Sequence, residues 1–205
     1  MGVAKTGKSG AEVEIKLLVH SPAALKRLLR SLDFRRTSAR HFESNHLFDF
    51  PDGRLRRSGR LLRLREEDGR WIATIKGPPA RSRRYKVRKE IESPVHDGEK
   101  VREVFAMLGL KETFCYQKFR TSYAPKRVGG SKGGVLDFDE TPIGTFVELE
   151  GPERWIDGVA RRLGYRRAAD LFRRQKAAGA WAGAWRRDQG IQRRPQDRHE
   201  RAAFG

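Results

Sequence analysis

The amino-acid sequence predicts an α+β fold in which antiparallel β-strands close into a barrel with helices packed outside. Three observations support this prediction. The predicted strands have one charged and one apolar face, the charged side chains occur in close pairs of one sign, and helices with apolar stripes lie between the strands. Such helices dock on the apolar strand faces, so the charged faces point into an enclosed space. A closed barrel provides that space and exposes no sheet edge.

The charged strand faces carry both signs on successive strands. A sheet with one solvated face is the ordinary explanation of such alternation. Paired like charges, however, repel one another on a shared surface unless something binds them. The acidic positions are Glu12, Glu14, Glu90, Glu92, Asp137, Glu148 and Glu150. The basic positions are Lys16, Arg63, Arg65, Lys76, Arg88, Lys118 and Arg120.

The elements follow from periodicity and from turn residues. Residues 12–19 (EVEIKLLV) alternate charged and apolar side chains and predict a strand. Ser21 and Pro22 then begin a helix as its cap and first residue. This helix has an apolar stripe of Leu25, Leu28, Leu29 and Leu32. Residues 40–50 predict a strand that ends at the Pro-Asp-Gly turn 51–53.

The middle and the end of the domain continue this alternation of strands and helices. Residues 61–79 (LLRLREEDGRWIATIKGPP) predict a hairpin that stops at Gly-Pro-Pro. Further strands are expected at 84–92, 112–124, 135–139 and 144–150. Helices are expected at 97–109, from Pro152 to Leu163, and at 167–176.

Composition divides the 205 residues into three parts. Residues 1–10 are expected to form a disordered arm, residues 11–175 one domain, and the Arg-rich residues 176–205 a flexible basic tail. The formal net charge of +19 favours a polyanionic partner, namely nucleic acid, polyphosphate, nucleotide or an anionic membrane. The tail could contact nucleic acid by counterion release, with a merely solvated tail as the alternative. The sequence does not decide whether the protein forms a homodimer.

A single cysteine, Cys115, excludes an intramolecular disulfide and a cysteine-based zinc cluster. Its strand-like surroundings favour a buried, inert thiol over a nucleophile. No apolar stretch approaches the roughly 20 residues of a membrane span, and the basic N-terminus is unlike a secretory signal. We therefore expect a soluble, cytoplasmic protein without a membrane partner.

A polar barrel interior must be satisfied by water, ions or a ligand. Carboxylate pairs two residues apart offer hard oxygen ligands for Mg²⁺ or Mn²⁺. Arginines and lysines facing them suit the oxygens of a phosphate chain. The interior is therefore expected to take a di- or triphosphate together with a divalent metal ion.

Residues 2–9 (GVAKTGKS) match the P-loop pattern G-x-x-x-x-G-K-[ST]. A P-loop follows a buried strand and opens a helix, whereas only Met1 precedes this match and a predicted strand follows it. We interpret the match as accidental. The phosphate signal that remains is Glu12-Val13-Glu14-Ile15-Lys16, the E-x-E-x-K that comes next.

An ordered series of motifs over residues 11–175 resembles the CYTH family, the triphosphate tunnel metalloenzymes. After E-x-E-x-K come Leu47-Phe48-Asp49, resembling the family's YFD strand, and residues 58–78 (SGRLLRLREEDGRWIATIKGP). Then follow R-x-E-x-E from Arg88, K-x-R-x-x-Y from Lys118 to Tyr123, and residues 135–151 (VLDFDETPIGTFVELEG). E-x-E-x-K alone is weak evidence for this family, but the ordered series of motifs is highly specific for it.

The resemblance implies an eight-stranded antiparallel tunnel and assigns roles inside it. The implied metal ligands are Glu12, Glu14, Asp137, Glu148 and Glu150, with Mg²⁺ or Mn²⁺ as cofactor. The implied substrate-binding residues are Lys16, Arg63, Arg65, Lys76, Arg88, Lys118, Arg120 and Tyr123. Glu12, Glu14, Lys16 and Lys76 are the implied catalytic residues, and Glu90 and Glu92 line the tunnel in less certain roles. Tyr123 could instead only pack against the tunnel wall.

The resemblance leaves three functions open. The leading one is a metal-dependent triphosphatase acting on tripolyphosphate, thiamine triphosphate or a nucleoside triphosphate. The first alternative is a class IV adenylyl cyclase, in doubt because the His-Phe that such cyclases carry before E-x-E-x-K is missing here. The second is an inactive polyphosphate- or nucleic-acid-binding module, which would have no need of metal ligands. Asp139 is expected to face solvent or a turn, and the histidines to lie on the surface or in loops.

Overall fold

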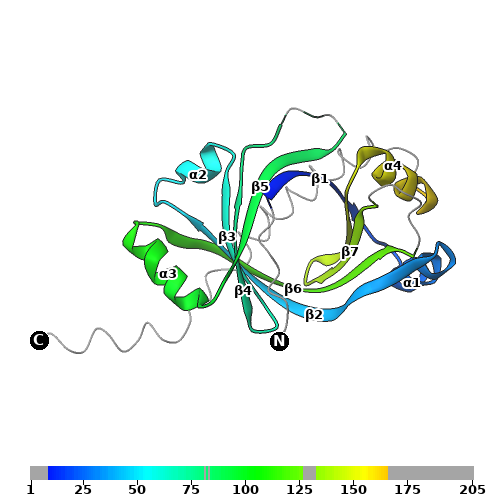
Figure 1. Ribbon diagram of the computed structural model, residues 1–205, viewed down its shortest axis with the longest axis horizontal. Coiled ribbons are helices and arrows are strands. Elements are labelled where there is room, and N and C mark those ends of the chain that lie inside the picture. Colours follow the sequence, from blue (N-terminus) through cyan, green and yellow to red (C-terminus); the bar gives the residue numbers. More distant parts are fainter. Residues whose placement is uncertain (1–8, 81, 83, 127–132, 166–205) are drawn as a thin grey trace, which may run out of the picture. The chain divides into compact units, whose positions relative to one another are not determined.

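The computed structural model describes residues 9–80, 82, 84–126 and 133–165. Within them, eight antiparallel strands form a closed barrel in the order β1-β5-β4-β3-β2-β6-β7-β8 (Figure 1). The strands are β1 Ser9–Leu18, β2 Phe34–Asp49, β3 Leu61–Glu67, β4 Arg70–Lys76, β5 Lys86–Val95, β6 Lys111–Pro125, β7 Val135–Thr141 and β8 Gly144–Glu150. The predicted fold class is thus confirmed.

The barrel consists of two meanders joined by the first strand. Strands β2 to β5 pair in chain order, as do β6 to β8, and the long β2–β6 pairing joins the two sets along one side. On the other side β1 lies between β5 and β8, with Glu12 opposite Arg88 and Lys16 opposite Glu148. The barrel therefore closes through pairing of the first strand with the last.

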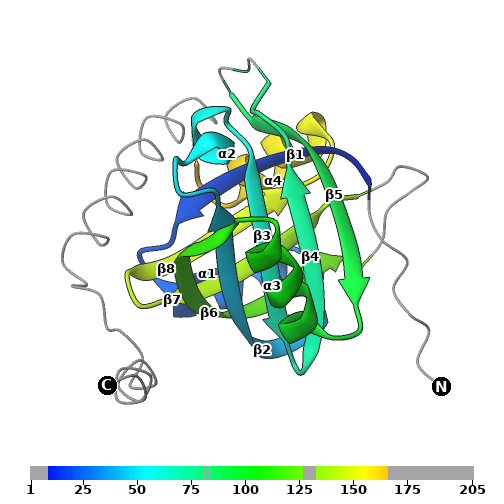
Figure 2. The same ribbon diagram turned by 90° about the vertical axis from the view of Figure 1, so that its left-hand side faces the viewer.

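The helices lie outside the barrel over two apolar clusters (Figure 2). Helices α1 (Pro22–Ser31) and α4 (Glu153–Arg162) contribute Leu29 and Ile156 to a cluster over β1, β7 and β8. Helix α3 (Gly98–Met107) contributes Val101 and Phe105 to a second cluster on β2 to β4. The outer strand faces are thus the apolar ones, which leaves the charged faces to the interior.

Capping residues set where these helices begin. Ser21 accepts from the amide of Ala24 at the start of α1, and Asp97 accepts from the amide of Lys100 at the start of α3. Asp49 at the end of β2 accepts from the amides of Phe50, Leu55 and Arg56, which fixes the short helix α2 (Arg54–Arg57) against the barrel. These hydrogen bonds explain why the Leu-Phe-Asp strand ends in an aspartate.

Two strands begin earlier than expected, and three predicted features lie wholly or mostly outside the described residues. Strand β1 begins at Ser9, inside the predicted arm, and β2 begins at Phe34, because its early residues pair with β6 despite a sequence (FRRTSA) that lacks alternation. All of the P-loop match except Ser9, the helix expected at 167–176 and the basic tail lie outside the described residues. The domain boundaries therefore stay predictions. None of the described helices is long and apolar enough to cross a membrane.

Candidate active site

The barrel interior is lined by charged side chains from every strand. The register places them on one continuous face, opposite the buried apolar side chains of the outer clusters. The acidic residues on this face are Glu12, Glu14, Glu43, Glu67, Glu90, Glu92, Asp137, Asp139, Glu148 and Glu150. The basic ones are Lys16, Arg63, Arg65, Lys76, Lys86, Arg88, Lys118 and Arg120. Acidic and basic groups thus nearly balance inside the described barrel.

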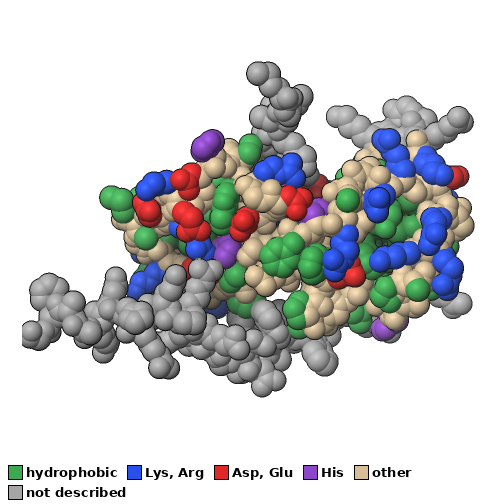
Figure 3. All heavy atoms as spheres, turned by 90° about the horizontal axis from the view of Figure 1, so that it is seen from below, with side chains coloured by type: hydrophobic (Ala, Val, Ile, Leu, Met, Phe, Trp, Pro, Cys, Tyr) green, Lys and Arg blue, Asp and Glu red, His purple; other side chains and the backbone are tan. Residues whose placement is uncertain are grey.

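The excess positive charge of the chain therefore lies elsewhere. In Figure 3, Lys and Arg side chains gather at the right, over α1 and the first part of β2, while acidic and basic groups mix around α3 at the left. Arg27, Arg30, Arg35, Arg36 and Arg40 are exposed in this region. A high net charge therefore says little by itself about the site inside the barrel.

Lys76 on β4 joins a carboxyl group of the neighbouring strand β5 to one of β1, the strand beyond it. Its Nζ lies 2.7 Å from Oε2 of Glu12 and 2.9 Å from Oε2 of Glu90. Burial raises the pKa of Glu90 and a hydrogen bond with Glu12 raises it further, to about 7. Burial opposes ionisation of Glu12 too, but the hydrogen bond with Glu90 and the charge of Lys76 lower its pKa to about 2. Glu12 is therefore the ionised partner of this pair at neutral pH.

Arg120 is the centre of a second network, on the opposite side of the barrel. Its Nε and Nη2 lie 2.6 and 2.7 Å from the two oxygens of Asp139, and Nη2 lies 2.6 Å from Glu148. Lys118 Nζ lies 2.8 Å from Asp139 and 3.4 Å from Glu43. Asp139 is fully buried (0 % exposed), so the expectation that it faces solvent or a turn is wrong. Strand β7 runs to Thr141, beyond the expected end, and holds Asp139 inward beside Asp137.

The other predicted basic residues also contact carboxylates or backbone oxygens. Lys16 Nζ lies 2.9 Å from Oε1 of Glu148, and Arg63 Nη2 lies 3.1 Å from Oε1 of Glu92. Arg65 lies 3.4 Å from Glu67, and Arg88 donates to the carbonyl oxygen of Gly59. The cations that could hold a phosphate chain are thus held largely by the interior's own carboxylates.

Several buried polar atoms of the interior have no hydrogen-bond partner among the described residues, although Oε2 of Glu43 and Nε of Arg65 lie within ion-pair distance of an opposite charge. They are Oε2 of Glu43, both amide atoms of Asn45, and the Nε atoms of Arg63, Arg65 and Arg88. Buried polar atoms without partners are costly unless water, an ion or a ligand satisfies them. The interior is therefore built for a polar occupant.

The carboxylates of β1 and β8 are of the donor type that a divalent metal ion takes. Glu12 and Glu14 share the inner face of β1, Glu148 and Glu150 that of β8, and Glu14 lies directly opposite Glu150. Four carboxylates on two paired strands supply the oxygen ligands that Mg²⁺ and Mn²⁺ prefer. Asp137, opposite Glu148 on β7, extends the acidic group.

Tyr123 is the predicted site residue that does not lie inside. Lys118, Arg120 and Ser122 face inward on β6, so Tyr123 projects to the outer face and packs against the cluster below α1 and α4. Strand alternation thus disagrees with the motif that includes this tyrosine.

The sequence interpretation missed other interior residues. Glu43 and Asn45 lie on the inner face of β2, and Glu67 continues the inward series of Arg63 and Arg65. Extending the period of two along each strand would have found them. The histidines also need correction, because His41 Nε2 lies 3.4 Å from Oε1 of Glu43 inside the barrel, and His46 on the outer face is only 4 % exposed.

A closed antiparallel barrel with an ion-paired interior defines this chain as a β-barrel protein with an internal polar site. More particularly, it belongs to the CYTH domain family, whose model matches residues 10–159. A curated relative from Methanocaldococcus jannaschii, named "Putative adenylate cyclase MJ0240", is 34% identical over 68% of this chain and 75% of its own length. The recognised resemblance is thus confirmed.

Solved structures agree on the fold. A protein from Pyrococcus horikoshii is 26% identical, with a TM-score of 0.61, over 76% of this chain and 91% of its own. HpAC1 from Hippeastrum, 21% identical with a TM-score of 0.56 over 75% of this chain and 88% of its own, is described as a putative adenylyl cyclase with a dominant triphosphatase activity. At that identity the likeness establishes the fold alone.

Proposed function

We propose that this protein is a divalent-metal-dependent phosphohydrolase that acts on a triphosphate-containing substrate inside the barrel. The substrates we propose are tripolyphosphate, thiamine triphosphate or a nucleoside triphosphate. The observation that carries this proposal is the meeting of carboxylates and cations on one inner face, as at Glu148, which contacts both Lys16 and Arg120. A pure polyanion binder has no use for the four facing carboxylates of β1 and β8.

Each group of residues has a distinct task in this proposal. Glu12, Glu14, Glu148 and Glu150, with Asp137, hold Mg²⁺ or Mn²⁺, which supplies a Lewis acid that polarises the scissile phosphate. Lys16, Lys76, Lys118 and Arg120 bind phosphate oxygens, as do Arg63, Arg65 and Arg88. Because these cations are fixed on strands, they stabilise charge that develops on the transferring phosphoryl group without first having to reorganise.

An adenylyl cyclase is the second candidate, favoured by the name of the relative from Methanocaldococcus jannaschii. Both reactions use the same residues to bind the triphosphate. They differ in the nucleophile, which is water for the hydrolase and the ribose 3′-hydroxyl for the cyclase. The triphosphatase activity in the description of HpAC1 is a property of that protein, and it illustrates that a protein of this fold can be a hydrolase. The residues before Glu12 lack the His-Phe pair of class IV cyclases, which favours hydrolysis.

Product analysis tests the proposal. The protein is incubated with Mg²⁺ or Mn²⁺ and, separately, tripolyphosphate, thiamine triphosphate and ATP, and the products are resolved by chromatography. We expect phosphate release that is lost in Glu12→Gln and Glu148→Gln and kept in Glu140→Gln, an outward residue of β7 paired with Arg40. Cyclic AMP with pyrophosphate would overturn the proposal in favour of the cyclase. Tight polyphosphate or RNA binding without turnover would support the binding module.

A further inference from the structure

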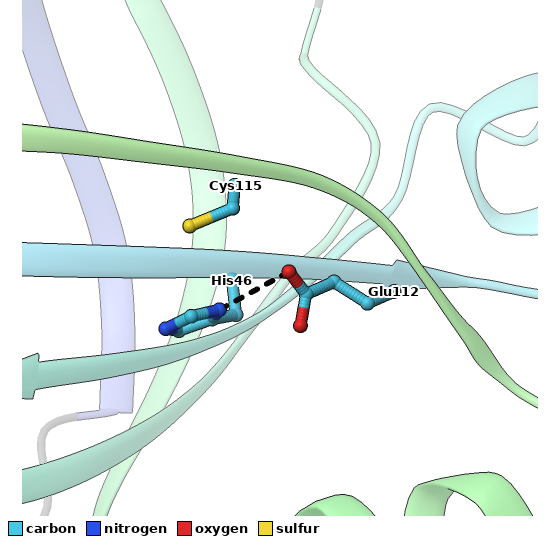
Figure 4. A group of neighbouring side chains, drawn as sticks. All are labelled: His46, Glu112 and Cys115. Atoms are coloured by element: carbon cyan, nitrogen blue, oxygen red, sulfur yellow. Dashed lines mark ion pairs between the residues drawn. The ribbon is translucent and has the colours of Figure 1, made fainter. Parts of the chain in front are cut away.

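Three side chains that can bind metal ions meet on the outside of the barrel, on the face opposite the charged interior (Figure 4). His46 on β2 and Cys115 on β6 are register partners, and Glu112 lies three residues before Cys115 on the same strand. The neighbouring residues Asn45 and Tyr116 alternate to the inner face. This cluster is therefore separate from the carboxylates proposed to hold metal inside the barrel.

The donor atoms of the cluster are close enough for one ion. One atom each from His46, Glu112 and Cys115 lie within 4.8 Å of one another, and His46 Nδ1 lies 3.2 Å from Oε1 of Glu112. The other ring nitrogen, Nε2, lies 3.1 Å from Oγ of Ser44, which fixes the orientation of the imidazole. Metal-binding histidines commonly have such a partner on the second nitrogen.

A cation already occupies part of this cluster. Arg102 of α3 places Nη2 at 2.7 Å from Nδ1 of His46 and at 2.5 Å from Oε2 of Glu112. Depending on its tautomer, Nδ1 of His46 accepts from this guanidinium or donates to Oε1 of Glu112. Nδ1 and the Glu112 carboxylate, 3.2 Å apart, both lie beside this positive charge.

Arg102 also has another carboxylate within reach. Its Nη1 lies 3.5 Å from Oε2 of Glu99, one turn earlier on α3. Glu112 is partly open to solvent, with 35% of its side chain exposed, and Cys115 is only half-buried. A cation arriving from solvent could therefore take the place of the guanidinium while Arg102 keeps an ion pair with Glu99.

We propose that His46, Glu112 and Cys115 form a binding site for a divalent transition-metal ion of the Zn²⁺ type. One imidazole, one thiolate and one carboxylate are a donor set for Zn²⁺ or Co²⁺, whereas Mg²⁺ prefers oxygen donors only. Three protein ligands leave a fourth position for water on the solvent side. Cys115 is then a metal ligand, in place of the inert thiol that the sequence suggested.

Cobalt titration tests this site directly, because Cys115 is the only cysteine of the chain. Co²⁺ is added to the reduced, full-length protein, and the near-ultraviolet thiolate-to-cobalt absorption is followed. We expect a saturable band at one equivalent, displaced by Zn²⁺ but kept in excess Mg²⁺. The band should vanish in Cys115→Ser, and the affinity should fall by at least about tenfold in Glu112→Gln and His46→Gln. Circular dichroism establishes that each variant is folded, and the partly exposed Glu112 provides a test even if His46→Gln fails to fold.

Two further variants sharpen the result. Arg102→Gln should tighten cobalt binding, because the competing guanidinium is removed, while Arg27→Gln, at an exposed position of α1, should leave it unchanged. Glu148→Gln, which removes a proposed ligand inside the barrel, should leave the thiolate band intact, so this test and the test of the proposed function fail separately. The absence of a band at millimolar Co²⁺ would overturn the proposal, as would a band of equal affinity in folded Glu112→Gln protein.

Discussion

Lys16 and Glu148, on the paired strands β1 and β8, form an ion pair inside the barrel with 2.9 Å between Nζ and Oε1. In the proposed function, Lys16 binds phosphate and Glu148 binds metal. Before these ligands bind, the two side chains are paired with each other. Engagement of the carboxylate by a metal ion frees the ammonium group for phosphate. Metal and triphosphate are therefore expected to bind with positive coupling, which is necessarily reciprocal.

Calorimetry of tripolyphosphate binding with and without Mn²⁺ measures this coupling. In Glu12→Gln protein, where hydrolysis is expected to be lost, we expect Mn²⁺ to tighten binding by about tenfold, or about 1.4 kcal/mol. The double variant Glu12→Gln/Lys16→Met should bind more weakly and lose much of the coupling. Equal dissociation constants with and without Mn²⁺ would contradict the exchange of partners at Glu148.

Asp139→Asn should strongly destabilise the fold. Asp139 is fully buried and is the shared partner of Arg120 and Lys118, so the change leaves buried cations with fewer counter-charges. The loss of one partner of a buried ion pair costs about 3–5 kcal/mol. Urea unfolding measures the change. Its neighbour Glu140 pairs with Arg40 at the surface, and Glu140→Gln should cost less than about 1 kcal/mol. Equal effects of the two substitutions would refute a central role for Asp139.

The ionisation of Glu43 should make the free energy of unfolding depend on pH in the acid range. Burial alone would raise its pKa, but the charges of Lys118 and Arg120 outweigh burial and lower the pKa to about 2. Because the pKa is lower in the folded state, the stabilisation is complete above the ordinary value of 4.5 and is lost as pH falls toward 2. It amounts to about 3 kcal/mol at most.

Urea unfolding of Glu43→Gln at several pH values checks this expectation. The difference in free energy of unfolding between the two proteins should be largest at pH 6–8 and shrink as pH falls below about 4.5. Glu103→Gln, on the exposed face of α3, should differ little from the parent protein throughout. A difference that stays constant down to pH 3 would mean that the ionisation of Glu43 contributes nothing.

Gly98 allows α3 to approach β4. A Cβ atom at this position would lie 2.0 Å from Cδ2 of Trp71, so the helix or the indole would have to move. We expect Gly98→Ala to lower the free energy of unfolding by about 1–3 kcal/mol. Gly158→Ala in α4 is the matched control, because among the described residues no atom beyond the surrounding helix backbone and the chain neighbours lies within 4 Å of the added methyl group. There the helix should gain about 0.5–1 kcal/mol. Thermal or urea unfolding of both variants distinguishes the packing effect from the change of residue type.

Strand alternation accounts for most of what the sequence could predict. Paired charges two residues apart, as in Glu12–Glu14 and Glu148–Glu150, predicted inward faces without any knowledge of the neighbouring strands. The same rule places Asp139 inside, yet the strand was expected to end at this residue, so its side chain was assigned to solvent or a turn. For Tyr123 the motif indicated substrate binding, with packing against the tunnel wall as the alternative, and the alternation places it on the outer face.

Other features could not be predicted because they depend on which strands become neighbours. Glu43 has no like-charged partner two residues away, and only the pairing of β2 with β6 brings it to Lys118. The cluster of His46 and Cys115 likewise exists only through this register, since the two residues are far apart in the chain. Spacing along β2 can place Glu43 on the inner face, but it carries no signal for its contact with Lys118 or for the cluster of His46 and Cys115.

The place of β1 between β5 and β8 also determines when this protein can fold. Lys16 and its partner Glu148 are 132 residues apart, so the closing strand must wait for the last strand. Bringing such distant segments together costs chain entropy before any contact compensates for it, which makes folding slow compared with that of helical bundles. During synthesis, the segment bearing Glu12 and Glu14 therefore leaves the ribosome before β8 and pairs with it only after β8 has been made.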